Sequence, residues 1–212
     1  MTYKIQSLDE WKRKEQFLFY NEFTEPMYGI SVDLDITSLY RYCRKNEQSI
    51  FVSYLHEIIK AVNCIEEFRY RYDGENVIVY DQIGISVTVA RENETFAFSY
   101  IDYDANFSDF AESAASEIAR VRETSDFTPF ANKLDLIHFS AVPWIQFTSL
   151  SHARHHEFKD TIPKISTGKI YHSGERTLMP ISVHAHHGLV DALHIGKLYS
   201  LVENNIQERY GA

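Results

Sequence analysis

The chain has little cysteine, no long hydrophobic run and no hydrophobic leader at its start. Only two cysteines, Cys43 and Cys64, occur in 212 residues, and both lie in helical patterns where we expect buried, reduced thiols. No run of about 18 apolar residues exists that could span a membrane, and residues 1–7 do not resemble a signal peptide. These absences predict a cytoplasmic protein without a membrane partner.

Glycine-rich nucleotide motifs and basic runs are also missing. Without a Gly-x-Gly-x-x-Gly or Walker sequence, a Rossmann or P-loop cofactor site is not expected. The net charge is −9, and no basic run offsets it, so nucleic acid is not expected as a partner. An anionic ligand would therefore need a local cationic patch.

Apolar residues are plentiful, at 44% of the chain, with 14% aromatic residues, which is ample for a packed core. No linker or internal repeat is visible, so residues 1–212 are expected to form one domain. Helical patterns cover residues 8–24, a segment after Asp35-Ile36-Thr37, and residues 50–66, 107–121 and 191–207. Strand-like patterns cover residues 77–80, 85–89, 95–100, 136–142, 164–172 and 178–186. Because helices and strands do not alternate strictly, an α+β fold with a mixed β-sheet covered by helices is predicted.

The best candidate for chemistry is His187 in His186-His187-Gly188-Leu189-Val190-Asp191, where an apolar strand gives way to a helix. A histidine in such a place can act as a general base near neutral pH. From the spacing alone, a surface histidine followed by an aspartate that caps the helix is the more frequent arrangement. Asp191 could also serve both as cap and as functional partner.

Two other kinds of site are weaker. Ten histidines suggest a metal, with His184 and His186 on one strand and His152, His155 and His156 in a polar loop. No zinc-binding spacing is present, so no metal is expected. A Ser-His-Asp hydrolase is not favoured because no Gly-x-Ser-x-Gly elbow exists. Ser140, near a strand end, is either an ordinary strand serine or a hydroxyl donor to an oxyanion.

Several short motifs, in order along some 180 residues, together resemble the trimeric, CoA-dependent chloramphenicol acetyltransferase family. They are Trp11-Lys12-Arg13-Lys14-Glu15-Gln16-Phe17, Leu34-Asp35-Ile36-Thr37, Glu67-Phe68-Arg69, Glu94-Thr95-Phe96, Ser140-Ala141-x-Pro143-Trp144, Phe147-Thr148-Ser149, Thr167-Gly168-Lys169, Met179-Pro180-Ile181 and His186-His187-x-x-x-Asp191. The resemblance implies the two-layer sandwich of CoA-dependent acyltransferases. It also implies a homotrimer with active sites between subunits, acetyl-CoA as co-substrate and a small-molecule hydroxyl as acceptor.

The resemblance also implies roles for particular residues. His187 matches the general base, Ser140 the oxyanion donor, and Thr167 a threonine that holds an ordered water. Asp191 and Arg13 match an ion pair that supports the catalytic loop. Tyr20, Tyr28, Phe96 and Phe98 are candidates for an aromatic acceptor pocket, or else ordinary core, and Lys169 is either a CoA phosphate contact or a solvated lysine.

Some positions depart from the family pattern. Ala192 replaces a glycine after Asp191, and residues 150–158 are polar and basic where the drug-modifying members are apolar. The motifs therefore predict the chemistry better than the acceptor. Two alternatives stay open: an acyltransferase resembling the dihydrolipoyl acyltransferase cores, and a homologue without catalysis that binds small molecules.

Overall fold

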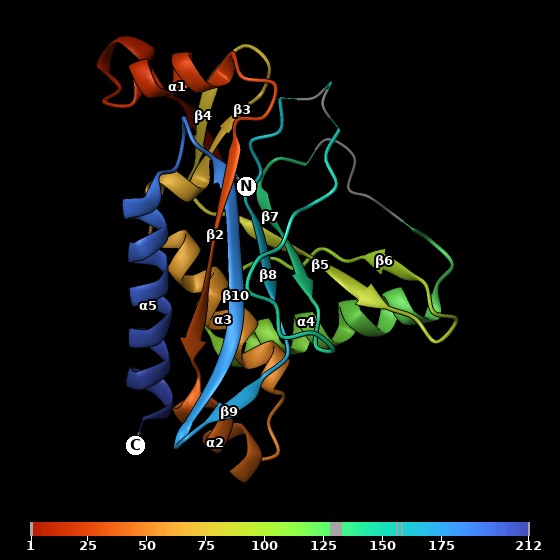
Figure 1. Cartoon of the computed structure of the whole chain (residues 1–212). Helices are drawn as coiled ribbons and strands as arrows, with labels where there is room; N and C mark the ends of the chain where they lie inside the picture. Colours follow the sequence, from red (N-terminus) through yellow and green to blue (C-terminus); the bar gives the residue numbers. More distant parts are fainter. Residues whose placement is uncertain (1, 128–132, 156, 158, 212) are drawn as a thin grey trace.

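The computed structural model describes residues 2–127, 133–155, 157 and 159–211, and Figure 1 shows how its helices cover a mixed sheet. Seven strands of the described chain form this sheet: β2 (Met27–Asp35), β10 (Arg176–His186), β8 (Lys164–Thr167), β7 (Leu136–Ala141), β5 (Gly84–Ala90), β6 (Phe96–Phe98) and β9 (Tyr171–Ser173), the last beside β10. Strand β7 runs parallel to β5 and β8, and the other pairs are antiparallel. The predicted α+β class and mixed sheet are confirmed.

Four helices pack together on the sheet: α2 (Thr37–Lys45), α3 (Ile50–Asn63), α4 (Phe107–Glu123) and α5 (Ala192–Tyr210), with α3 in contact with the other three (Figure 1). Successive side chains of a strand point to opposite faces of a sheet. Phe139, Ile165 and Val183 therefore enter the apolar core. Ser140 and Ser166, which are paired across β7 and β8, lie on the other face. That second face is polar and carries the candidate site. None of the helices in the described part of the chain has the length and apolar character needed to cross a membrane.

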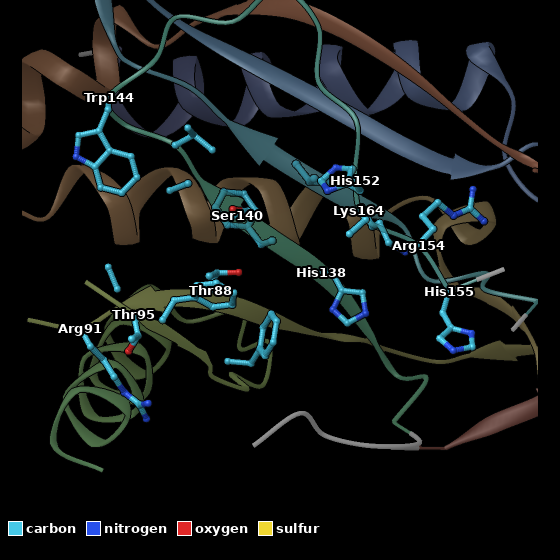
Figure 2. A pocket seen from close by; sticks show the side chains of 18 of the residues that line it. Thr88, Arg91, Thr95, His138, Ser140, Trp144, His152, Arg154, His155 and Lys164 are labelled. Carbon is cyan, nitrogen blue, oxygen red and sulfur yellow. The ribbon is translucent and has the colours of Figure 1, made fainter. Parts of the chain in front are cut away.

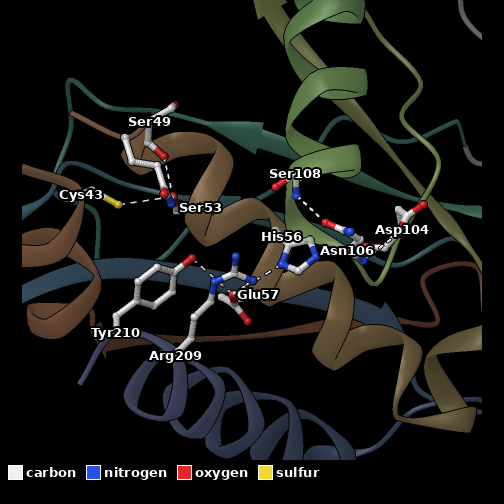
Figure 3. A network of polar contacts seen from close by, with 11 residues as sticks. Cys43, Ser49, Ser53, His56, Glu57, Asp104, Asn106, Ser108, Arg209 and Tyr210 are labelled. Carbon is white, nitrogen blue, oxygen red and sulfur yellow. Dashed lines mark hydrogen bonds and ion pairs between the residues drawn. The ribbon is translucent and has the colours of Figure 1, made fainter. Parts of the chain in front are cut away.

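A buried polar network joins three of these helices (Figure 3). The carboxylate of Glu57 on α3 is fully buried and accepts a hydrogen bond from the Tyr210 hydroxyl at 3.4 Å. Arg209, also on α5, places Nη1 3.6 Å from the same oxygen. His56 Nε2 lies 3.0 Å from the carbonyl of Asp104, before α4. The network fixes α3 relative to both neighbours.

A smaller sheet, β1 (Tyr3–Ile5), β4 (Val77–Tyr80) and β3 (Tyr70–Tyr72), flanks the large one. Arg71 on β3 is fully buried, and its guanidinium donates hydrogen bonds to the carbonyls of Phe68, Tyr70, Leu134 and Leu136. Burial lowers the Arg71 pKa to about 10, so the group remains a cation at neutral pH. It thereby holds the start of β7, the strand that carries Ser140.

The predicted helix over residues 8–24 is wrong as a single element. A short 3-10 turn, Leu8–Glu10, is followed by α1 (Lys14–Asn21), and Trp11 between them has an extended backbone. The Trp11 ring packs 5.7 Å from Phe17 and 5.0 Å from Tyr70, ring centre to ring centre. Burying this indole turns the chain inward and interrupts the helix.

The predicted strand over residues 164–172 is also wrong, because it is divided into β8 and β9. Both pair with β10, and the break lies opposite Pro180. Gly168 N–H donates to the Pro180 carbonyl at 2.8 Å, but proline has no N–H to donate in return. The ladder therefore ends at Thr167.

Two further differences concern β2 and the cysteines. The sequence analysis assigned no strand to residues 27–35, although Tyr28, Ile30, Val32 and Leu34 alternate with other residues as in a strand. Cys43 is buried as expected, whereas the expectation for Cys64 is wrong, since it is exposed at the end of α3, where no packing covers it. Two residues of the polar segment 150–158, His156 and Phe158, lie outside the described residues.

Candidate active site

The turn between β10 and α5 carries His187 and is held by one arginine. Arg13 Nη1 lies 2.8 Å from Asp191 Oδ2. The same guanidinium donates from Nε to the Gly188 carbonyl at 3.2 Å and from Nη2 to the His187 carbonyl at 3.3 Å. A Cβ at Gly188 would lie 2.8 Å from Phe17 Cα, so this close approach requires glycine. One side chain thus fixes the whole turn against the segment before α1.

Asp191 has two functions in this turn. Its side chain accepts a hydrogen bond from Leu193 N–H at 2.9 Å, and its N–H donates to His194 Nδ1 at 3.1 Å, which makes a capping box for α5. Burial opposes ionisation of Asp191, but the Arg13 hydrogen bond and nearby positive charge outweigh it and lower its pKa. The cap that the sequence allowed is confirmed, and the carboxylate pairs with Arg13.

The His187 ring lies between two tyrosine rings. The ring centres of Tyr20 and Tyr28 are 4.3 Å and 4.2 Å from that of His187, and both are stacked on it. The backbone N–H of His187 donates to the Pro26 carbonyl at 2.9 Å. Nδ1 is enclosed and has no hydrogen-bond partner among the described residues, so Nε2 is the nitrogen available to a ligand. The stacking gives the imidazole a defined orientation.

The neighbouring His186 cannot take the same part. It is 1% exposed, and its Nδ1 accepts a hydrogen bond from Gly188 N–H at 3.1 Å. Burial lowers the pKa of His186 to about 4, so its ring is neutral at pH 7. Of the two adjacent histidines, only His187 can reach a ligand.

Ser140 lies in a different place, in a pocket of about 890 Å³ on the polar face of the sheet (Figure 2). Phe96, Phe98 and Trp144 give this pocket aromatic walls. Among the described residues, neither His187 nor Tyr20 or Tyr28 lines it. The structure therefore separates the predicted site residues into two groups, one around His187 and one around Ser140.

Thr167 and Lys169 lie at the end of β8. Thr167 is buried, and its hydroxyl donates to the Tyr54 hydroxyl at 3.4 Å. Lys169 is exposed and does not line the pocket, but its backbone N–H donates to the Ile145 carbonyl at 2.9 Å. Lys169 is thus attached to the loop that carries Trp144, whose indole does line the pocket.

A set of basic side chains lines the same pocket, and the sequence analysis did not place them there. Figure 2 shows His138, His152, Arg154, His155 and Lys164 on one side of Ser140, with Trp144 and Arg91 away from them. Burial lowers the pKa of His138 to about 4, with a further contribution from Lys164, and lowers that of His152 to about 4, with a further contribution from His184. The sequence does hold one indication of this arrangement: His138 and Ser140 are two residues apart on a strand and therefore share a face.

Histidines are frequent here, but they do not converge on a metal. In the part of the chain that the structure describes, no group of three His, Cys, Asp or Glu side chains is arranged to hold an ion. His152 and His184 instead pack edge to face, 4.9 Å between ring centres. The arrangement suits hydrogen bonding to an organic ligand.

Comparison with known proteins gives one family. The family model described as chloramphenicol acetyltransferase matches residues 1–203. Chloramphenicol acetyltransferase from Escherichia coli is 27% identical over 99% of this chain and 96% of its own length, and that from Clostridium perfringens is 27% identical over 94% and 93%.

Solved structures agree with this assignment. A chloramphenicol acetyltransferase structure is 29% identical and superposes with a TM-score of 0.90 over 97% of this chain and all of its own. A probable dihydrolipoamide acetyltransferase from Listeria monocytogenes shares the acyltransferase fold at 14% identity, with a TM-score of 0.68 over 96% of this chain and 94% of its own. The family model over residues 1–203, the near-full-length similarity and the superposition agree, and the chain belongs to the chloramphenicol acetyltransferase family.

Proposed function

We propose that the protein transfers the acetyl group of acetyl-CoA to a hydroxyl of chloramphenicol or a related small molecule. The observation that carries this proposal is the His187 ring, stacked between Tyr20 and Tyr28 with Nε2 as its available nitrogen. A neutral imidazole that holds its proton on Nδ1 can accept another on Nε2. Such a group is the general base that acetyl transfer to a hydroxyl requires.

The proposed reaction begins when His187 Nε2 takes the proton of the acceptor hydroxyl. The hydroxyl oxygen then bonds to the thioester carbonyl carbon, and the Ser140 hydroxyl donates a hydrogen bond to the resulting oxyanion. When the carbon–sulfur bond breaks, the His187 imidazolium returns the proton to the departing sulfur. The products are the O-acetyl ester and CoA with a free thiol.

The site is proposed to form between subunits of a homotrimer. Within one chain, His187 does not line the pocket that contains Ser140, Phe96 and Phe98. A second copy of the chain that placed its His187 at this pocket would bring the proposed base together with Ser140, Phe96 and Phe98. Exposed apolar side chains near His187 support such an interface: Leu18 and Phe19 on α1, and Phe23 just after it, are each more than two-fifths exposed.

Acetyl-CoA would extend from this junction along the end of β8. Thr167, to which the resemblance assigns an ordered water, is buried beside β7 on the face opposite to Ser140, and Lys169 is an exposed cation for a phosphate. We place the reaction in the cytoplasm, which is supported by two cysteines that are both free thiols.

The substitution of Ala192 for glycine does not weaken the proposal. Ala192 is the first residue of α5 and is not among the described residues with a positive φ. Alanine has high helix propensity and fits this backbone without strain. A catalytically inactive homologue therefore gains no support from this position.

The test is thiol release from acetyl-CoA in the presence and absence of chloramphenicol. We expect release that depends on the acceptor and falls by a factor on the order of 10² to 10⁴ in His187→Ala, because a positioned base contributes about that much. The matched control is His172→Ala, since His172 is an exposed histidine on β9 away from the pocket. Equal rates for His187→Ala and wild type would contradict the proposal. So would acetyl-CoA binding without transfer to chloramphenicol or any other hydroxyl tested.

A further inference from the structure

The basic side of the Ser140 pocket has polar nitrogens that no described residue hydrogen-bonds. Among the described residues, neither His152 Nε2 nor Arg154 Nε has a hydrogen-bond partner, although both are enclosed, and His152 Nε2 is a donor in the tautomer that carries its proton there. Both side chains line the pocket. An enclosed donor without a partner costs free energy unless a ligand supplies the acceptor. These donors therefore indicate a ligand that presents oxygen acceptors.

The acidic groups at this side of the pocket, Asp160 in the lining and Glu25 outside it beside Arg154, are already occupied. Asp160 forms an ion pair with Lys164 and accepts the Ile162 N–H at 2.9 Å. Glu25 forms an ion pair with Arg154 and accepts the Met27 N–H at 3.2 Å. The carboxylates are thus matched, while donors remain on Arg154 and His152. The hydrogen-bonding groups left without a described partner on this side of the pocket are therefore donors.

The two histidines on this side are suited to an anion. His138 and His152 are desolvated and neutral at pH 7, each with a pKa lowered to about 4. A neutral imidazole offers one N–H, whereas a protonated one offers two. A neighbouring anion would raise both pKa values by favouring the charged form. Arg154 and Lys164 are each paired with a carboxylate, so the lining offers an anionic ligand hydrogen-bond donors rather than an excess of positive charge.

We propose that the preferred acceptor carries a carboxylate in addition to its hydroxyl, and that the carboxylate binds His138, His152 and Arg154. This inference rests on the proposed function, since it assumes that the acceptor hydroxyl lies at Ser140. His138 and Ser140 share a face of β7 two residues apart, about 7 Å along the strand. The acceptor is therefore a short molecule, with a ring against Phe96 and Phe98 and its two polar groups at opposite ends.

The probes are 4-(hydroxymethyl)benzoate and its methyl ester, which share the ring and the hydroxyl but differ in the charge and by one methyl group. We expect the acid to bind at least about tenfold more tightly than the ester at pH 7, because charge-assisted hydrogen bonds are stronger than neutral ones. Calorimetric titration of the protein measures both affinities without any acetyl transfer. Arg154→Met and His152→Leu should remove most of this preference, and Arg154→Lys should keep part of it.

The control is His172→Leu, which makes the same chemical change on exposed β9 and should leave the preference unchanged. Equal affinity for acid and ester in wild type, or a preference that survives in both Arg154→Met and His152→Leu, would overturn the inference. Transfer to chloramphenicol without acid preference would leave the proposed function standing and refute only the carboxylate. Acid binding that depends on Arg154, with no transfer to any hydroxyl, would refute the proposed function and retain the anion site.

Discussion

Arg13 Nη1 and Asp191 Oδ2 lie 2.8 Å apart and join the residue before α1 to the residue that caps α5. The turn between them contains His187, so the ion pair connects stability with the orientation of the proposed base. Asp191→Asn removes the charge but keeps a good helix cap. Asp191→Ala removes both.

The first prediction concerns this pair. Arg13→Met and Asp191→Asn should each lower the free energy of unfolding by about 1–3 kcal/mol. Each substitution leaves the other charge of this partly exposed pair uncompensated. Urea unfolding of the single and double variants measures the coupling. We expect the double variant to lose much less than the sum of the singles, and simple additivity would show that the two side chains act independently.

The second prediction concerns the tyrosines around His187. Tyr28→Phe keeps the stacked ring and removes a buried hydroxyl that no described residue hydrogen-bonds, so the free energy of unfolding should rise by about 1 kcal/mol. Tyr28→Leu loses the stacking and should lower kcat for acetyl transfer. Chemical denaturation and steady-state kinetics of the two variants separate these effects. If the Tyr28 hydroxyl instead binds the acceptor, Tyr28→Phe will have a higher KM for the acceptor.

The third prediction concerns Arg71. Arg71→Met should lower the free energy of unfolding by about 3–5 kcal/mol, because four main-chain carbonyls near the start of β7 lose the guanidinium that donates hydrogen bonds to them. Thermal unfolding checks this, with Arg69→Met as a matched change at a neighbouring, less buried arginine. If both variants melt at the same temperature, the carbonyl cluster is not a main support of β7.

The fourth prediction concerns acid. Burial lowers the pKa of His138, His152 and His186 to about 4 from an ordinary 6.5. Between these values the unfolded chain binds more protons than the folded one, so stability should fall as pH drops from about 6.5 to about 4.

Melting temperatures across that pH range test this expectation. His138→Gln cannot take up the proton and should flatten the slope, whereas His172→Gln, at an exposed position, should not. A stability that does not change over this range would mean that the three rings titrate alike in the folded and unfolded chains.

Local patterns predicted helices α2 to α5 and most of the strands. The apolar run before His187 and the Asp191 cap predicted a strand-to-helix turn, and the structure confirms it. Local patterns failed to predict the ends of elements where contacts between distant parts of the chain determine them. The gap opposite Pro180 depends on which strand lies beside β10, and the break at Trp11 depends on packing against Tyr70.

The candidate site shows the same limit. Motif order placed His187, Ser140 and Phe96 in a family, but it could not show that Ser140 and His187 lie in separate parts of one chain. Nor could it bring His152 from a loop beside His184 on β10, since 32 positions separate them along the chain. The donors on the basic side of the pocket were visible only once the chain was folded.

The separation of His187 from Ser140 has a consequence for genetics. If every working centre takes its base from one copy and its oxyanion donor from another, two defective alleles can rescue each other. Chains with His187→Ala and chains with Ser140→Ala, each inactive alone, would regain some activity when they assemble together, because some centres would receive both intact residues. In a cell that carries one normal allele and one His187→Ala allele, the defective chains would in turn silence centres built partly from normal ones.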